Sequence, residues 1–144
     1  MSDAKSTVWD ANLYLKFADH RTRPALDLMG RLDPANGARP GHAIYDLGCG
    51  AGNISRILAE RFPESPVIGI DSSEEMLAKA RSQTVDARVT FAKGDLAHFE
   101  PSLPPGILYS NAAYQWLDGH IDMFPGLLKL LPPGGQLAIQ MPRN

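Results

Sequence analysis

The sequence predicts an α/β fold in which a doubly wound, mostly parallel sheet is covered by helices on both faces. Short apolar runs of strand length, rich in β-branched and aromatic residues, alternate along the chain with segments of helical periodicity. Most of the glycines and prolines fall between these segments. Strands that alternate with helices form right-handed βαβ units, and such units build parallel sheets.

The strands and helices of the sheet region can be assigned in order. Strands are expected at residues 43–45, 67–70, 89–91, 107–109 and 136–140. Apolar residues within 54–62 recur at the spacing of one helix face. Ser72 and Glu75 have the spacing of a capping box, which predicts a second helix directly after the second strand. Another helix is expected over residues 121–131, where prolines and glycines end it.

The region before the first strand has a different pattern. Trp9 and Phe17 lie on one face of a predicted helix, and Pro24 suits the first turn of a second helix. We therefore expect residues 1–40 to form an amino-terminal helical cap on the sheet. Residues 41–144 are expected to form the ligand-binding core.

Composition limits the classes of protein to consider. The 144 residues, 44% hydrophobic and 21% charged, are those of one globular domain. The net charge of −2 and the lack of a long Lys/Arg run argue against nucleic acid and anionic membranes as partners and favour a small molecule. With no signal-peptide core and no apolar run of membrane-spanning length, a cytoplasmic protein is expected. Cys49 is the single cysteine, so neither a disulfide nor a metal site is expected.

The most informative segment is a strand that runs directly into glycines and then into a helix. Gly48, Gly50 and Gly52 let the backbone approach a ligand, and the following helix presents free N–H groups. Asp71 ends the next strand, where an acid can accept hydrogen bonds from ribose hydroxyls. Asn53 stands at the third glycine position of a dinucleotide-binding loop, which argues against a pyrophosphate. These residues favour a cofactor that carries a nucleoside; the alternative for Asp71 is a charge that stabilises the next helix.

The pattern D-x-G-x-G-x-G that begins at Asp46 resembles motif I of the class I S-adenosylmethionine-dependent methyltransferases. In the same order along the chain, Asp71 resembles that family's ribose-binding acid, Asp95 its adenine-binding acid, and Asn111 the start of its motif beneath the sulfonium. For Asp46 and Asp95 the alternative is a structural role in a turn. The resemblance implies a Rossmann-like sheet in the strand order 3-2-1-4-5, with S-adenosylmethionine as the cofactor. The cofactor-binding residues that it implies are Asp46, Gly48, Gly50, Gly52, Asp71, Ser72, Asp95, Leu96, Asn111 and Ala112.

Longer stretches resemble the trans-aconitate methyltransferases over nearly the whole chain. Residues 9–17 and 21–28 look like that family's opening, and residues 111–117 and 140–142 look like its later signatures. The resemblance implies transfer of a methyl group from S-adenosylmethionine to a carboxylate of trans-aconitate or a similar polycarboxylate. A carboxylate is already ionised at neutral pH, so no catalytic base is assigned. The substrate-binding residues that we expect are Tyr14, Arg21, Arg23 and Gln115, with a solvated surface pair as the alternative for the two arginines.

The family has two further strands after the fifth, so the resemblance describes an amino-terminal portion, truncated after the fifth strand. Activity is therefore open, and one alternative is an inactive remnant that binds S-adenosylmethionine without turnover. Another is a nicotinamide-dependent dehydrogenase, which Asn53 and the lack of a Tyr-x-x-x-Lys pair oppose. The fifth strand would form an apolar edge without a charge, so we expect self-association through that strand.

Overall fold

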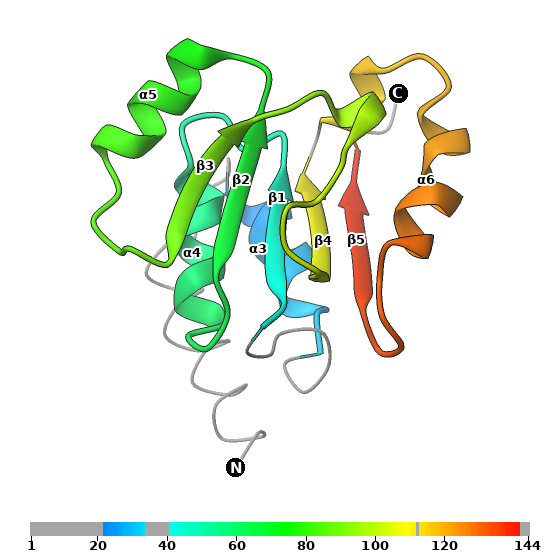
Figure 1. Cartoon of the computed structure of the whole chain (residues 1–144), viewed down its shortest axis with the longest axis horizontal. Coiled ribbons are helices and arrows are strands. Elements are labelled where there is room, and N and C mark those ends of the chain that lie inside the picture. The colour runs from blue at the N-terminus through cyan, green and yellow to red at the C-terminus, as the bar shows by residue number, and fades with distance from the viewer. Residues whose placement is uncertain (1–21, 34–40, 112, 142–144) are drawn as a thin grey trace.

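The computed structural model describes residues 22–33, 41–111 and 113–141 (Figure 1). Five parallel strands form one sheet in the order β3-β2-β1-β4-β5, so the predicted fold class and strand order are confirmed. The strands are β1 (Ala43–Leu47), β2 (Val67–Asp71), β3 (Val89–Lys93), β4 (Pro105–Asn111) and β5 (Gln136–Gln140). The helices are α3 (Arg23–Gly30), α4 (Asn53–Arg61), α5 (Glu74–Ser82) and α6 (His120–Lys129), with short 3-10 helices η2 (Leu96–His98) and η3 (Tyr114–Trp116).

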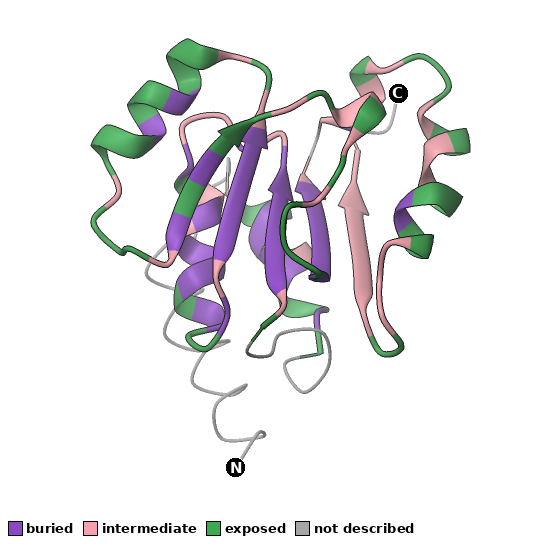
Figure 2. Ribbon diagram, in the orientation of Figure 1, coloured by how far each residue is buried: buried purple, intermediate pink, exposed green. Residues whose placement is uncertain are grey.

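The strand β1 forms the centre of the sheet. Its Ile44 pairs with Val67 of β2 on one side and with Ile107 of β4 on the other. All five residues of β1 are buried, as expected for the central strand of a parallel sheet that is covered on both faces, and they include the carboxyl group of Asp46. In contrast, every residue of the edge strand β5 is only half-buried (Figure 2).

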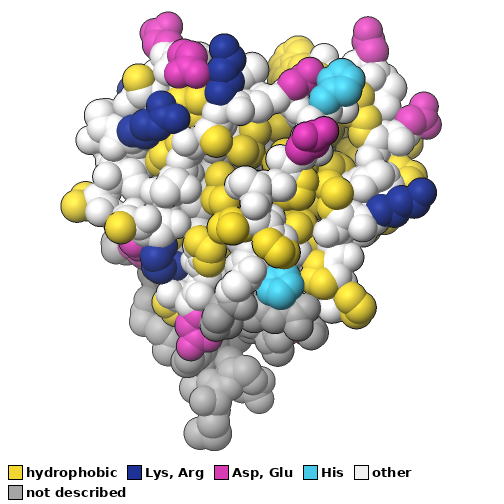
Figure 3. All heavy atoms as spheres, viewed as in Figure 1, with side chains coloured by type: hydrophobic (Ala, Val, Ile, Leu, Met, Phe, Trp, Pro, Cys, Tyr) yellow, Lys and Arg dark blue, Asp and Glu magenta, His cyan; other side chains and the backbone are white. Residues whose placement is uncertain are grey.

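The two faces of the sheet are covered unequally. One face packs against α3, α4 and α5, and only three apolar side chains in that core are partly exposed: Leu28, Ile54 and Ala138. The other face packs against α6 and the two short helices. Ten of its apolar side chains are partly exposed: Leu96, Phe99, Leu117, Met123, Phe124, Leu130, Leu131, Leu137, Ile139 and Met141. Figure 3 looks onto this second face, where hydrophobic side chains gather over the sheet between α5 and α6.

The helix α3 is the described part of the predicted amino-terminal cap. Pro24 lies in its first turn, as predicted, and Leu26 and Met29 pack into the core. The Tyr109 hydroxyl of β4 donates a 2.8 Å hydrogen bond to the Ala25 carbonyl, which fixes α3 to the sheet. The remaining residues assigned to the cap, 1–21 and 34–40, lie outside the described residues. Among the described helices, none is both long and apolar enough to cross a membrane.

The cap of α5 differs from the predicted one by a single residue. Ser73, and not Ser72, is the N-cap, and its hydroxyl accepts a 3.2 Å hydrogen bond from the Met76 amide. The predicted capping box between Ser72 and Glu75 is therefore wrong. The Asp71 carboxylate accepts a hydrogen bond from the Ser73 amide, which holds Ser73 in the extended conformation of an N-cap, so that the helix begins at Glu74.

Candidate functional site

The glycine loop joins β1 to α4 at the carboxyl ends of the strands, the edge where open α/β sheets bind ligands (Figure 1). The amides of Gly48 and Cys49 both donate to the Ile70 carbonyl of β2, at 2.8 and 2.9 Å. The Ser110 hydroxyl of β4 donates to the Leu47 carbonyl at 2.8 Å. The neighbouring strands on both sides therefore hold the start of the loop.

Two glycines of the loop leave no room for a side chain. Gly48 and Gly52 both have φ of +84°, in the left-handed region that glycine adopts without strain. A Cβ at Gly48 would collide with the Ala113 side chain, and a Cβ at Gly52 would lie 2.7 Å from the ring of Phe91. The backbone of the loop therefore packs directly against the side chains of Ala113 and Phe91. Gly52, as the N-cap of α4, has no side chain to satisfy the amides of the first helical turn.

Asp71 ends β2 beside this loop. Its Oδ2 accepts the Gly50 amide at 2.9 Å and its Oδ1 accepts the Ser73 amide at 3.0 Å. A carboxylate has about four acceptor positions, so these two bonds leave others for a ligand. Asp71 therefore orients the loop and can still accept hydroxyl groups. Ser72 is exposed next to it.

Leu96 and Asp95 follow β3. A methyl group of Leu96 lies 3.6 Å from the Cβ position of Gly48, so Leu96 borders the glycine loop. Asp95 is exposed and is the N-cap of η2, where it accepts the Ala97 amide at 2.9 Å and pairs with Nδ1 of His98 at 3.0 Å. The hydrogen bond from His98, with that from Ala97, holds the pKa of Asp95 below its usual range.

Asn111 ends β4 on the far side of the loop. Its Oδ1 is buried and makes no hydrogen bond within the described part of the chain, so it is an acceptor that a ligand could satisfy. Gln115 lies half-buried in η3, close along the chain to Ala113, which contacts Gly48. Ala112 lies outside the described residues.

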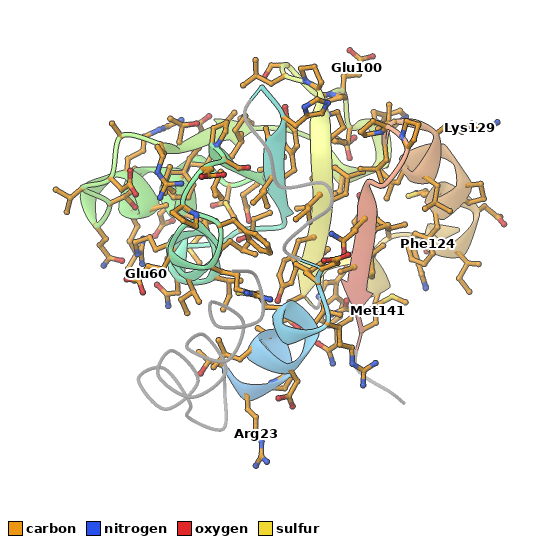
Figure 4. The ribbon with its side chains drawn as sticks, turned by 90° about the horizontal axis from the view of Figure 1, so that it is seen from below. Arg23, Glu60, Glu100, Phe124, Lys129 and Met141 are labelled. Carbon is orange, nitrogen blue, oxygen red and sulfur yellow. The ribbon has the colours of Figure 1, made fainter. Side chains whose placement is uncertain are left out.

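The predicted site residues do not all share this surface. Arg23 is exposed at the start of α3 and projects away from the sheet (Figure 4). Tyr14 and Arg21 lie outside the described residues. Asp46 is buried in the core beneath α4, where it accepts a 2.7 Å hydrogen bond from the Ser55 hydroxyl. That bond ties β1 to the first turn of α4.

Two buried groups near the loop have raised pKa values. Burial raises the pKa of Asp46 to about 6, because the Ser55 hydrogen bond compensates only part of the lost hydration. Burial raises the pKa of the Cys49 thiol to about 12, with smaller contributions from Asp46 and Asp71. Cys49 therefore stays protonated and is no nucleophile. Among the described residues, no group of three His, Cys, Asp or Glu side chains could hold a metal ion.

Sequence reasoning did not identify Ser55 or Arg56 as part of this region. Ser55 bonds to Asp46 across the β1–α4 interface, and Arg56 donates to the Ala51 carbonyl of the loop at 3.1 Å. The available signal for Ser55 was a hydroxyl residue in the first turn of the helix that follows the strand carrying Asp46. No pattern in the sequence marks Arg56.

A parallel sheet in the order 3-2-1-4-5, with a glycine loop after β1 and an acid at the tip of β2, is typical of α/β domains that bind nucleoside-bearing ligands. Residues 44–135 match the methyltransferase domain family. The chain belongs to this family of methyltransferase domains.

Individual relatives agree with this assignment. The chain is 48% identical over 136 residues to a trans-aconitate 2-methyltransferase of Methylobacterium nodulans, and 47% identical over 137 residues to one of Acidovorax ebreus. Each comparison covers 94% of this chain and 50% of the relative, so the chain spans about half the length of the curated relatives it matches. The crystal structure of an S-adenosylmethionine-dependent methyltransferase from Mesorhizobium loti is similar with a TM-score of 0.67 at 30% identity, over 87% of this chain and 53% of that one.

The buried carboxyl of Asp46 makes a pH dependence of stability testable. Its pKa of about 6 in the folded protein lies above the usual 3.8, so the stability that its protonated form contributes is complete below about pH 4 and is lost as pH rises through about 6. In the Asp46→Asn variant, the amide still accepts from Ser55 but cannot ionise. Between about pH 4 and about pH 8, its free energy of unfolding should rise relative to wild type by on the order of 3 kcal/mol.

Urea denaturation across this pH range measures the difference. Asp122→Asn, which removes an exposed carboxylate from the first turn of α6, is the matched control and should follow the wild-type pH profile. If the difference between Asp46→Asn and wild type does not change with pH, the Asp46 carboxyl is not held protonated by burial.

Proposed function

We propose that this protein binds S-adenosylmethionine at the glycine loop and transfers its methyl group to a carboxylate of trans-aconitate or a similar small polycarboxylate. The observation that carries the proposal is the side-chain-free loop at Gly48 and Gly52 next to Asp71, whose carboxylate retains acceptor positions. The matches to trans-aconitate 2-methyltransferases over 94% of this chain support the substrate class.

The residues of the site fit the cofactor. The loop backbone would bind the amino-acid portion, and Asp71 with Ser72 beside it would bind the ribose hydroxyls. Asp95 would accept the adenine amino group beside Leu96. The buried Oδ1 of Asn111 has no hydrogen-bond partner in the described part of the chain, and we propose that the cofactor supplies one. Asn111 and the adjacent Ala112 would form the floor of the site. A Haemonchus contortus phosphoethanolamine N-methyltransferase that is similar to this chain, with a TM-score of 0.66 at 30% identity over 83% of this chain and 28% of that one, has been solved in complex with S-adenosyl-L-methionine.

The proposed methyl transfer needs no proton transfer by a protein side chain. S-adenosylmethionine, when bound, supplies an electrophilic methyl group. A carboxylate substrate with a pKa near about 4 is already ionised at neutral pH, so no side chain needs to act as a base. The protein's part is to align the carboxylate with the methyl group and to exclude water, which can contribute roughly 7–11 kcal/mol at best. The protonated thiol of Cys49 and the buried carboxyl of Asp46 take no part in such a transfer.

Cations would hold the negatively charged substrate. We assign this role to Arg21 and Arg23, because a guanidinium can bind a carboxylate through two parallel hydrogen bonds, and we propose Tyr14 and Gln115 as further substrate-binding residues. Arg23 is exposed at the first position of α3, where it is free to meet a ligand from solvent. The alternative is a protein that binds the cofactor without turnover.

The ribose assignment is tested first. Asp71→Ala should weaken S-adenosylhomocysteine binding about tenfold or more, since hydrogen bonds to a charged acceptor contribute about 1.5–3 kcal/mol each. Isothermal titration calorimetry gives the affinity. Glu74→Ala, which removes an exposed carboxylate from the first turn of α5, is the matched control and should bind as wild type does.

A ligand analogue separates the two roles of Asp71. Because Asp71 also holds the Gly50 amide, its loss could act through the loop alone. An S-adenosylhomocysteine analogue without the two ribose hydroxyls should therefore lose much less affinity than the parent compound on Asp71→Ala. Equal losses for both ligands would remove the ribose role. Binding of NAD in preference to S-adenosylhomocysteine would overturn the cofactor assignment and favour a dehydrogenase.

The substrate assignment is tested by turnover of trans-aconitate with S-adenosylmethionine. Arg23→Lys should raise the KM several-fold, because an ammonium group cannot form the paired hydrogen bonds of a guanidinium. Arg31→Lys, at the other end of α3, is the control and should leave the KM unchanged. If wild type binds S-adenosylhomocysteine but does not methylate trans-aconitate, the cofactor-binding alternative is correct.

We also propose that the 144-residue chain self-associates through β5. Within the described residues this strand pairs only with β4, so its outer backbone groups lack strand partners. Leu137 and Ile139 of β5 belong to the poorly covered face of the sheet. An unpaired edge beside partly exposed apolar side chains is a template for pairing with a second copy.

A charge on the strand tests this association. Gln140→Lys adds a cation to the edge strand without removing an apolar side chain, and it should shift the chain toward monomer. Gln83→Lys adds the same charge at the exposed end of α5 and serves as the control. Sedimentation velocity over a concentration series measures both variants. A wild-type chain that stays monomeric at the highest concentration would contradict the proposal.

A further inference from the structure

Arg56, in the first turn of α4, connects the glycine loop and the start of its own helix to a distant segment of the chain. Its Nη1 donates to the Ala51 carbonyl of the glycine loop and to the Thr84 hydroxyl, both at 3.1 Å. Its Nη2 donates to Oδ1 of Asn53 at 2.6 Å. The acceptors belong to the loop, to the start of α4, and to the connection between α5 and β3.

The position of this arginine is electrostatically unfavourable. A cation near a helix N-terminus faces the positive end of the helix dipole, which typically costs about 0.3–1 kcal/mol. Partial burial also lowers the pKa of Arg56. None of its three hydrogen-bond acceptors is a carboxylate that would neutralise the charge. The guanidinium is therefore held here by its geometry, because five donors in a fixed plane can reach several neutral oxygens at once.

The contacts of Arg56 fix the last peptide of the glycine loop. The peptide between Ala51 and Gly52 is planar, and Arg56 holds its carbonyl while the Cys49 carbonyl accepts its N–H at 3.0 Å. A Cβ at Gly52 would lie 3.0 Å from Nη1 of Arg56 and 2.7 Å from the Phe91 ring. Gly52 is thus enclosed between the guanidinium and the ring.

Thr84, which accepts a hydrogen bond from Arg56, is itself fixed by a further hydrogen bond. The Thr84 hydroxyl donates to the Ala80 carbonyl at 2.7 Å, which places it on the last turn of α5. Its oxygen remains an acceptor for Arg56. The glycine loop is therefore tied to the α5 side of the sheet as well as to β2.

We propose that Arg56 is a positioning residue, which holds the glycine loop in the conformation that receives the cofactor by linking the Ala51 carbonyl to Thr84. That the loop receives S-adenosylmethionine rests on the function proposed above. Arg56 itself contacts no ligand in this assignment. It acts through the orientation of the Ala51–Gly52 peptide and of the first helical turn that follows.

Arg88 is a matched arginine at the other end of α4. It donates to the carbonyls of Ala59, Phe62 and Ser65 at 2.8 to 3.2 Å and pairs with Asp86 at 2.9 Å. It therefore ties the end of α4 and the connection that follows it to the residues before β3, through backbone carbonyls and away from the glycine loop. Removing it should cost stability without disturbing the loop.

The test compares Arg56→Ala, Arg56→Lys and Arg88→Ala in the 144-residue chain. Arg56→Ala should weaken S-adenosylhomocysteine binding about tenfold, the equivalent of about 1.4 kcal/mol, because the loop must be ordered on binding. Arg56→Lys should recover part of this loss, since an ammonium can reach some of the same acceptors. Arg88→Ala should lower the Tm and leave the affinity within about twofold of wild type.

Hydrogen exchange without any ligand provides the second measurement. Arg56→Ala should speed amide exchange in residues 48–53 and leave exchange in the strands unchanged. Arg88→Ala should leave exchange in residues 48–53 as it is in wild type. Wild-type affinity together with wild-type exchange in Arg56→Ala would overturn the inference. So would a loss of affinity in both alanine variants that simply follows their loss of Tm.

The two measurements also separate this inference from the proposed function. If wild type fails to bind S-adenosylhomocysteine but the loop still loosens in Arg56→Ala, the cofactor assignment fails and the positioning role stands. If wild type binds and the loop of Arg56→Ala is unchanged, the positioning role fails and the cofactor assignment stands.

Discussion

The carbonyl oxygen of Ile70, shared by the amides of Gly48 and Cys49, is the contact on which the rest of the site depends. It brings the end of β1 across the tip of β2 and so sets where the loop begins. This crossing is possible only because side chains are missing beneath it. A Cβ at Gly69 of β2 would lie 2.6 Å from the Phe91 ring and 2.8 Å from Sγ of Cys49. The glycine in the middle of a buried strand thus has a packing reason, since the loop rests directly on the strand.

Charged groups around the loop act mainly by holding backbone. Asp71 accepts the amides of Gly50 and Ser73, and Arg56 donates to the Ala51 carbonyl. Asp46, inside the core, instead accepts a side-chain hydrogen bond from the Ser55 hydroxyl and so ties the first turn of α4 to β1. Both signs of charge therefore preorganise one short segment. Preorganisation matters because a loop that is already ordered loses less conformational entropy when it binds a ligand.

The two faces of the sheet are covered unequally, and the contacts of the glycine loop and the exposed apolar surface lie on different faces. The face under α3, α4 and α5 is almost closed, and it carries the contacts that shape the glycine loop. The face under α6 keeps ten apolar side chains partly exposed, with β5 at its edge. The contacts of Asp46 with Ser55 and of Arg56 with the loop lie on the closed face, whereas the apolar surface that a second polypeptide could cover lies on the open one.

The sequence by itself determined the order of strands and helices, the parallel sheet and the glycine loop, because each of these is written in local patterns. The alternation of strands with helices, the spacing of the glycines and the acid at the end of a strand are all patterns of residues that lie close together in the sequence. They can therefore be recognised without knowledge of the fold. The resemblance to methyltransferases then supplied the strand order and the cofactor, which no periodicity specifies.

Only the tertiary structure decided what each side chain near the loop contacts. Asp46 faces the core because residues alternate across β1, and its neighbour there is a residue of α4. The N-cap of α5 is Ser73, and not Ser72, where the Asp71 carboxylate accepts both the Ser73 amide and the Gly50 amide of the glycine loop. Arg56 and Thr84 are 28 residues apart, and they meet because β2 and β3 are adjacent in the sheet. Contacts between distant segments follow from packing the whole chain, and no local pattern of residues encodes them.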